Sequence, residues 1–203
     1  MLKGLVASGE LPPVDERVSD EPMVITPWEQ IGQYGGTWHR LAVGPDDIQM
    51  IPRINYNQMI RWSSGGGETV PNVVTGWEIN GDNTEFTFHL RRGMKWSDGA
   101  PYTSDDVAFY FEDWMTNEDL TPTVNSNLVR GGEPVAFTKL DDANFRLTFA
   151  APYPLLIPYL AGANLYWFHQ LPRHYLEQFH PNYTDQGTLD KAAKEAGFEF
   201  WYQ

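Results

Sequence analysis

The chain of 203 residues contains no cysteine. Disulfide bridges, thiolate catalysis and cysteine-based zinc sites are therefore excluded, while the redox compartment stays open. The sequence also has no apolar run that approaches the length of a membrane span. The first ten residues hold too few apolar side chains for the core of a signal peptide. From the sequence we expect no direct membrane insertion by this chain.

Basic residues are scarce as well. The chain has 14 Lys and Arg against 27 Asp and Glu, which gives a net charge of −13 and a pI of about 4.6. Nucleic acid and anionic membrane surfaces are poor partners for such a charge. Aromatic side chains are abundant, with 8 Trp, 10 Tyr and 11 Phe. These residues need a core to be buried in or a ligand to stack on, so the composition predicts a globular domain.

The most informative stretch runs from Thr84 to Met115. Its first part alternates Phe86, Phe88 and Leu90 with polar residues, which is typical of a strand with one buried face. The segment Ser97-Asp98-Gly99 then supplies turn chemistry, since Asp bonds nearby backbone and Gly accepts positive φ. The pattern predicts a strand followed by a tight turn.

A helix should follow this turn. Thr103 is placed to cap it, with Asp106 three residues later as a carboxylate variant of the capping box. An apolar stripe continues along one face of the predicted helix, at Val107, Phe111 and Trp114-Met115. We expect the Trp96 ring to be buried with its N–H bonded to an acceptor, so the stretch is interpreted as scaffold.

The N-terminal third gives weaker signals. A short helix is predicted at Leu2–Ser8, and the proline-rich segment Leu11–Arg17 is predicted to be extended because proline cannot donate to a ladder. After Gly35-Gly36 we expect a strand over Thr37–Val43, with Trp38 and Leu41 serving the core.

The remaining elements are predicted from alternation, turn residues and caps. They are a hairpin over 71–90 with its turn at 80–83, a hairpin of Val135–Leu140 and Asn144–Phe149, a buried strand at Asn164–His169, and helices after Pro154, over Pro172–Phe179 and over Thr188–Ala196, the last closed by Gly197.

The segment Leu90-Arg91-Arg92-Gly93-Met94-Lys95-Trp96-Ser97-Asp98-Gly99, followed by Pro101, Thr103 and Asp105-Asp106-Val107, resembles the signature of bacterial extracellular solute-binding proteins of family 5. These are receptors of ABC importers for oligopeptides, dipeptides and nickel. The resemblance implies a mixed α/β fold, namely part of a type II periplasmic-binding-protein-like lobe with a mixed sheet and β-hairpins.

The resemblance also implies a division of the chain. Residues 1–35 would form an extended leader segment, and residues 36–203 would form part of the first lobe of a two-lobe protein, without the second lobe. Family members are more than twice as long, and the aromatic cluster at 198–202 is unusual for a free end. We therefore expect the chain to be an N-terminal portion.

No residue pattern points to catalysis or to a metal. His169, His174 and His180 are spaced by five and six residues, so they do not match a zinc-protease helix, in which two histidines are four apart. The acid pairs Asp105-Asp106 and Glu112-Asp113 invite a glycosidase hypothesis, but neighbours on one helix do not face each other across a cleft. We expect no enzyme activity, no cofactor and no metal.

The resemblance places the ligand-facing part of the lobe within Ile48–Met59 and near Asn164–Phe168. Our candidate ligand-binding residues are Asn55, Tyr56, Met59 and Trp167. An amide beside an amphipathic ring, as in Asn55 and Tyr56, suits a peptide or a sugar, although each residue could equally serve packing.

The function implied by the family is capture of a small solute for an ABC permease of the inner membrane. Peptide is the first candidate ligand and oligosaccharide the alternative; a metal chelate also stays open. A carbohydrate hydrolase is the alternative from another class. The implied location is periplasmic or extracellular, associated with the cell surface.

Overall fold

A computed structural model describes residues 2–27, 29–33, 35–37, 39, 41, 43–44, 57–162 and 168–203. The helical elements are α1 (Leu2–Ala7), α2 (Val14–Arg17), α4 (Ser104–Ala108), η1 (Phe109–Trp114), η2 (Ser126–Leu128), α5 (Leu156–Leu160), α6 (Arg173–Leu176), η3 (Glu177–Phe179) and α7 (Gln186–Ala196). The strands are β1 (Ile60–Trp62), β2 (Thr69–Pro71), β3 (Val74–Ile79), β4 (Glu85–Leu90), β5 (Val129–Arg130), β6 (Glu133–Pro134), β7 (Ala136–Asp141) and β8 (Asn144–Thr148).

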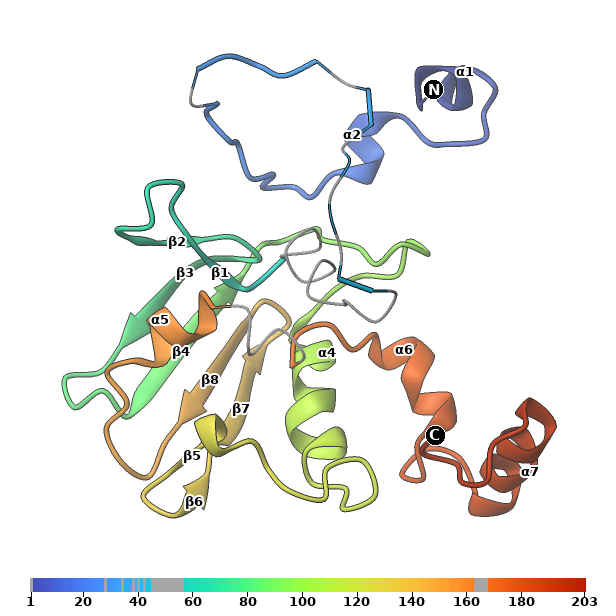
Figure 1. Cartoon of the computed structure of the whole chain (residues 1–203). Coiled ribbons are helices and arrows are strands. Elements are labelled where there is room, and N and C mark those ends of the chain that lie inside the picture. The colour runs from blue at the N-terminus through green and yellow to red at the C-terminus, as the bar shows by residue number, and fades with distance from the viewer. Residues whose placement is uncertain are drawn as a thin grey trace.

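The centre of the fold is a four-stranded sheet in the order β3-β4-β8-β7. Figure 1 shows α4 lying beside its β7 edge and the N-terminal segment passing above it. Both predicted hairpins are confirmed: β3 pairs with β4, and β7 pairs with β8. Every strand pair in the described ranges is antiparallel, so a mixed sheet is not seen in that part of the chain.

The core lies on one face of this sheet. The alternation of β4 holds, since Phe86, Phe88 and Leu90 are all buried. Phe88 stacks on Phe145 of β8, with ring centroids 5.2 Å apart. Burying an aromatic side chain of this size contributes roughly 2 to 3 kcal/mol to folding. The period-two pattern of the sequence thus identifies the strands that carry most of the core.

The predicted helix forms, with a change of geometry partway along. Its first turn, α4, has a complete capping box: Thr103 Oγ1 accepts from the main-chain N–H of Asp105 at 3.2 Å, and Asp106 Oδ2 accepts from that of Thr103 at 2.9 Å. The chain then widens into the π-helical η1, where the Met115 N–H reaches back to the Tyr110 carbonyl. Of the predicted stripe, only Trp114 remains half-exposed.

The Asp106 carboxylate ties three segments together. Besides Thr103, it accepts hydrogen bonds on Oδ1 from Trp96 Nε1 at 3.1 Å and from the main-chain N–H of Arg173 at 3.0 Å. The side chain is 3% exposed, and burial raises its pKa against the lowering effect of the hydrogen bonds. The predicted acceptor for the Trp96 N–H is therefore a carboxylate.

The N-terminal region differs from the sequence prediction in two places. Val14–Arg17 forms one helical turn rather than an extended segment, because Pro13 is tolerated before a helix and Asp15 and Glu16 favour its N-terminal end. Leu41 is 97% exposed, and positions 37, 39 and 41 are not in a strand, so its assignment to the core is wrong. Trp38 lies outside the described residues.

The other predicted helices are confirmed within a few residues, as α1, α5, α6 with η3, and α7. Gly197 closes α7 in the left-handed conformation, at φ 87°. Of the predicted strand Asn164–His169, residues 164–167 lie outside the described residues. Phe168 and His169 are buried in a turn instead of a strand.

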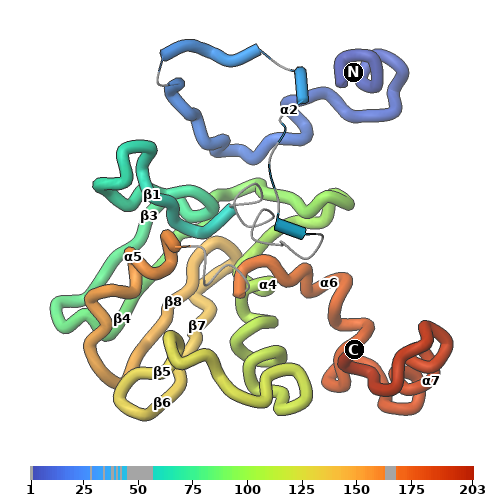
Figure 2. Tube along the Cα trace, viewed as in Figure 1, coloured from blue at the N-terminus to red at the C-terminus, as the bar shows by residue number. Residues whose placement is uncertain are grey.

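Residues 12–23 pack against the loop that follows β4. The Asp20 N–H donates to the Arg92 carbonyl at 3.2 Å, and Lys95 Nζ donates to the Glu16 carbonyl at 3.0 Å. Gly93 lies between these contacts at φ +73°, and a Cβ there would come within 2.6 Å of Asp20. Glycine at this position therefore allows the two backbones to approach. Figure 2 follows this segment along its path above β1 and β3.

We predict that Asp106→Asn lowers the free energy of unfolding by about 2 kcal/mol, because the amide nitrogen would face one of three buried N–H donors. Urea denaturation followed by tryptophan fluorescence measures the change. Asp105→Asn is the matched control, since its carboxylate makes only half-exposed ion pairs with Lys139 and Arg173, and should cost less than about 1 kcal/mol. Equal losses in the two variants would contradict the role assigned to Asp106.

We predict that Gly93→Ala releases residues 12–23 from the lobe, and that trypsin then cleaves after Arg17 several-fold faster. Gly99→Ala serves as the control, because Gly99 also has positive φ, at +93°, but has nothing within 4 Å of an added Cβ. Both variants should lose about 1 kcal/mol from the strained backbone. Unchanged cleavage in Gly93→Ala would show that the contact with Asp20 does not hold the segment.

Candidate functional site

Residues within or next to the two stretches expected to face the ligand are in contact in the structure. His169 Nε2 lies 2.9 Å from the main-chain carbonyl of Asn57, although the two residues are 112 positions apart. Gln170 Nε2 donates to the same carbonyl at 3.3 Å. These contacts join the described end of the Ile48–Met59 stretch to the two residues that directly follow the Asn164–Phe168 stretch.

Of the four candidate ligand-binding residues, only Met59 lies among the described residues. Asn55, Tyr56 and Trp167 lie outside the described residues, so their role stays a prediction. Met59 is 1% exposed and belongs to the hydrophobic core. This burial favours packing over ligand contact for Met59.

A cavity of about 380 Å³ lies beside this junction. Asn57, Tyr102, His169 and Gln170 line one part of it, and Asn72, Arg91 and Trp96 line another. Residues of the N-terminal segment, including Arg17 and Met23, complete the lining. The sequence does not predict this part of the lining, because no local pattern in residues 12–23 indicates where the segment will pack.

Asparagine and arginine side chains hold the walls of the cavity in place. Asn72 Nδ2 donates to Asn57 Oδ1 at 2.9 Å and to the Gln58 carbonyl at 2.6 Å. Arg91 donates through Nε and Nη2 to the Asn72 carbonyl, at 3.1 Å each, and through Nη1 to the Glu21 carbonyl at 2.6 Å. The guanidinium thus links the connection between β2 and β3, the loop after β4 and the N-terminal segment.

His169 is the buried titratable group of this site. Its side chain is 2% exposed, and burial lowers its pKa to about 4, partly opposed by the hydrogen bond to Asn57. Because a carbonyl can only accept, Nε2 carries the proton of the neutral ring and Nδ1 is a bare acceptor. Within the part of the chain that the structure describes, Nδ1 has no hydrogen-bond partner. The half-buried Tyr102 hydroxyl donates to the His169 carbonyl at 3.0 Å and fixes this backbone.

The other two histidines serve separate contacts. His174 Nε2 pairs with Asp98 Oδ2 at 2.7 Å, and this hydrogen bond lowers the pKa of Asp98. His180 is buried among Phe109, Tyr183 and Trp201. Across residues 57–162 and 168–203, no three His, Asp or Glu side chains come close enough to hold a metal ion.

The acid pairs are used for structure. Asp106 accepts from three donors, as described above, and Asp105 pairs with Lys139 and Arg173. Asp113 is buried and accepts from Asn182 Nδ2 and the Tyr183 hydroxyl, both at 2.7 Å. Burial and the hydrogen bond to Asp113 raise the pKa of Tyr183 to about 12. These contacts give Asp105, Asp106 and Asp113 a structural role.

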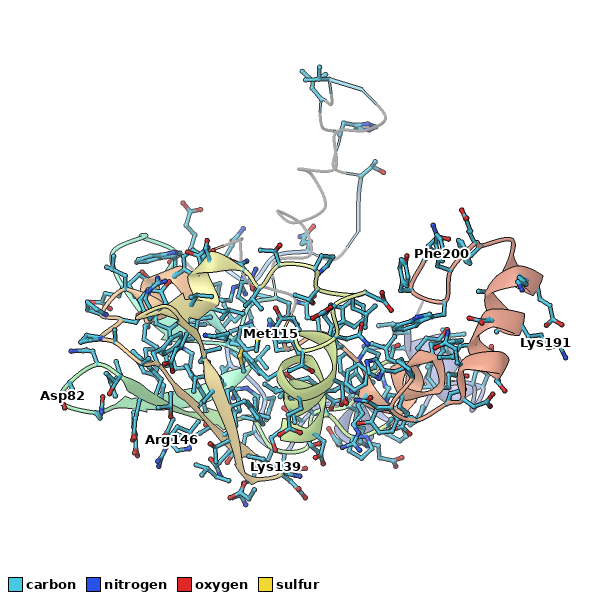
Figure 3. The ribbon with its side chains drawn as sticks, turned by 90° about the horizontal axis from the view of Figure 1, so that it is seen from below. Asp82, Met115, Lys139, Arg146, Lys191 and Phe200 are labelled. Carbon is cyan, nitrogen blue, oxygen red and sulfur yellow. The ribbon has the colours of Figure 1, made fainter. Side chains whose placement is uncertain are left out.

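A second concavity, of about 320 Å³, is an apolar groove beside α7. It is lined by side chains of η1, η3, α7 and the C-terminal residues, such as Phe109, Leu189 and Trp201. Figure 3 shows Lys191 of α7 at the opposite end of the molecule from Asp82 in the β3–β4 turn. This groove does not involve either stretch predicted to face the ligand.

Comparison with known proteins places these features in a wider group. Residues 68–198 match the family model described as bacterial extracellular solute-binding proteins, family 5 Middle. The periplasmic α-galactoside-binding protein of Rhizobium meliloti is 29% identical over 88% of this chain and 28% of its own length. The periplasmic oligopeptide-binding protein OppA of Escherichia coli is 23% identical over 73% of this chain and 30% of its own length.

Solved structures agree with these matches. A structure of an oligopeptide-binding protein OppA superposes with a TM-score of 0.86 and 38% identity, over all of this chain and 31% of that one. The binding protein MelB of Agrobacterium fabrum C58, in complex with stachyose, gives a TM-score of 0.62 and 25% identity, over 91% of this chain and 30% of that one. The chain therefore spans under a third of the length of these relatives. No helix among the described residues has the length and apolar character needed to cross a membrane.

We predict that the free energy of unfolding falls as the pH is lowered from 6.5 to 4. In this window the unfolded chain protonates His169 while the folded chain keeps it neutral, so acid favours unfolding with a slope that approaches about 1.4 kcal/mol per pH unit. Urea denaturation at several pH values, for wild type and His169→Phe, measures the effect.

The difference between the two proteins isolates His169, because the carboxylates titrate in both. As the pH falls through this window, the free energy of unfolding should decrease more steeply for the wild type than for His169→Phe. Parallel pH profiles would contradict the burial of a neutral imidazole at this position.

Proposed function

The chain belongs to the bacterial extracellular solute-binding proteins of family 5, and from this premise we propose that it forms part of a receptor that captures a small solute for an ABC importer. The observation that carries the proposal is the family match over residues 68–198, together with a superposition over the whole chain at a TM-score of 0.86. The fold is that of the type II periplasmic binding proteins, in partial form. Members of this family are substrate-binding receptors and not enzymes.

Two ligand classes follow from the relatives. One relative is named for α-galactosides and another for oligopeptides, so a peptide and an oligosaccharide are both candidates for this chain. The polar cavity beside Asn57 and His169 is the proposed contact surface for either ligand. Asn55 and Tyr56 directly precede Asn57 in the sequence, and Trp167 lies two residues before His169. We therefore retain these three residues as candidate contacts.

The proposed setting follows the family. We place the protein in the periplasm or outside the cell, at the cell surface, where it would deliver its ligand to an ABC permease of the inner membrane. Residues 1–35 act as the leader segment and residues 36–203 as part of the first lobe. In this arrangement a second lobe closes on the ligand, so that affinity comes from trapping between lobes.

One lobe should therefore bind weakly. If it supplies half the binding free energy of a micromolar receptor, the dissociation constant of this chain is about 1 mM. Isothermal titration calorimetry with an oligopeptide and with a neutral oligosaccharide measures this value. Binding tighter than micromolar by this chain alone would contradict the proposal that closure between two lobes generates the affinity.

The hydrolase alternative is tested on the same sample. A chromogenic glycoside should show no turnover, since the carboxylates of Asp105, Asp106 and Asp113 are engaged by neighbouring donors. Turnover that disappears in Asp106→Asn, but persists in Asp105→Asn, would replace the receptor assignment with an enzyme.

A further inference from the structure

The lining of the cavity beside His169 differs in charge from the rest of the protein. The chain as a whole carries 27 acidic residues against 14 basic ones. The described residues that line the cavity include Arg17, Arg91 and Lys95, and none of them is Asp or Glu. A ligand in this cavity therefore meets a neutral to positive surface.

This charge selects against a free ammonium group. A peptide brings a charged N-terminus, which in a partly buried site requires a carboxylate or several acceptors to offset its desolvation. The described lining offers no carboxylate, and its cations already donate to main-chain carbonyls: Arg17 to Pro12, Arg91 to Asn72 and Glu21, and Lys95 to Glu16. An ammonium ion would gain little here and be repelled by three cations.

The uncharged groups of the lining suit hydroxyls instead. Asn57 and Gln170 are exposed amides, and each already forms a hydrogen bond within the fold, Asn57 through Oδ1 and Gln170 through Nε2. An amide has two N–H donors and two acceptor lone pairs, so each can still bind neighbouring hydroxyls. His169 Nδ1 is a neutral acceptor without a partner among the described residues. A hydroxyl can donate to it without bringing a charge, although reaching this atom requires a small displacement of its neighbours, because it has almost no exposed surface.

Aromatic rings supply the remaining part of the lining. Trp96 and Tyr102 both border the cavity, with ring centroids 5.3 Å apart in an edge-to-face arrangement. The Trp96 N–H is engaged by Asp106, which fixes the ring in one orientation. A fixed aromatic ring can pack against the apolar face of a sugar, and the amide groups beside it can bind the hydroxyls at the edge of the sugar.

We propose that this cavity binds a neutral, polyhydroxylated ligand of the oligosaccharide class, in preference to a peptide. The inference rests on the proposed receptor function and decides between its two ligand classes. Asn57 and Gln170 are the specificity-determining amides, and His169 provides a neutral acceptor at the cavity wall.

The test is a side-by-side NMR titration of the whole chain with raffinose and with trialanine, at millimolar concentrations suited to weak binding. The readouts are the side-chain amide signals of Asn57 and Gln170 and the Nδ1 signal of His169. Raffinose should shift all three signals in a saturable manner, while trialanine should leave them unchanged. His174, which pairs with Asp98 away from the cavity lining, is the internal control and should not shift.

A variant pair gives a second measurement. Gln170→Ala should weaken raffinose binding about fivefold, which is the loss expected for one hydrogen bond. Gln178→Ala should not change it, because that exposed amide bonds only to the Tyr175 carbonyl. Both replacements are at exposed positions and should leave the fold intact.

The remaining outcomes each overturn the inference in a distinguishable way. Saturable shifts with trialanine and none with raffinose would assign the cavity to peptides and leave the receptor function standing. No shift with either ligand, while calorimetry still detects binding of one of them, would place the site elsewhere. Absence of binding in both experiments at saturating ligand would count against the receptor function as well.

Discussion

The structure depends on the buried carboxylate of Asp106. It accepts hydrogen bonds from the Trp96 indole, the Thr103 backbone and the Arg173 backbone, which belong to the turn, the helix cap and α6. A carboxylate has two oxygens with two lone pairs each, so three donors can be satisfied at once. No neutral side chain of similar size can accept from all three, and this explains why a charge is tolerated at 3% exposure. Fixing α6 in this way also fixes the chain just before it, where His169 lies.

A second constraint comes from the loop after β4. Arg91 and Lys95 donate to main-chain carbonyls of the N-terminal segment, and Gly93 lets that segment approach. These are contacts between a side chain and a backbone, so they depend on the path of the segment more than on its side chains. The same loop borders the cavity, so the segment that contacts it also becomes part of the cavity lining. This segment, whose first part the sequence predicts to be extended, thus contributes to the candidate site.

The stretch that identifies the family also supplies part of the wall of the candidate cavity, through Arg91, Trp96 and Tyr102. Thr84–Met115 supplies a strand, a turn and a capped helix, and most of its polar groups are satisfied within the fold. The cavity lies where this scaffold meets two stretches far apart in sequence, 57–58 and 168–170. Its lining is rich in amides and aromatic rings and, among the described residues, free of acids. This lining is the basis of the proposal that the cavity binds hydroxyl groups.

Several features could be predicted from the sequence because their causes are local. Alternation of Phe86, Phe88 and Leu90 placed β4, the Thr103 and Asp106 spacing placed the cap of α4, and Gly197 placed the end of α7. These patterns involve residues within one turn or one strand of each other, so backbone geometry alone determines them. The proximity of the Ile48–Met59 and Asn164–Phe168 stretches came instead from the family resemblance.

Other features were decided only by tertiary structure. The strand assigned to Thr37–Val43 was wrong at Leu41, whose side chain finds no core to enter. Met59 was a ligand candidate by position and is a core residue by packing. Contacts between residues tens of positions apart decide three further features. They are the neutral state of His169, the hydrogen bond from the Arg173 backbone to Asp106, and the position of residues 12–23 beside Gly93. Local patterns cannot encode such contacts, because burial and hydrogen bonding between distant segments exist only after the chain has closed around them.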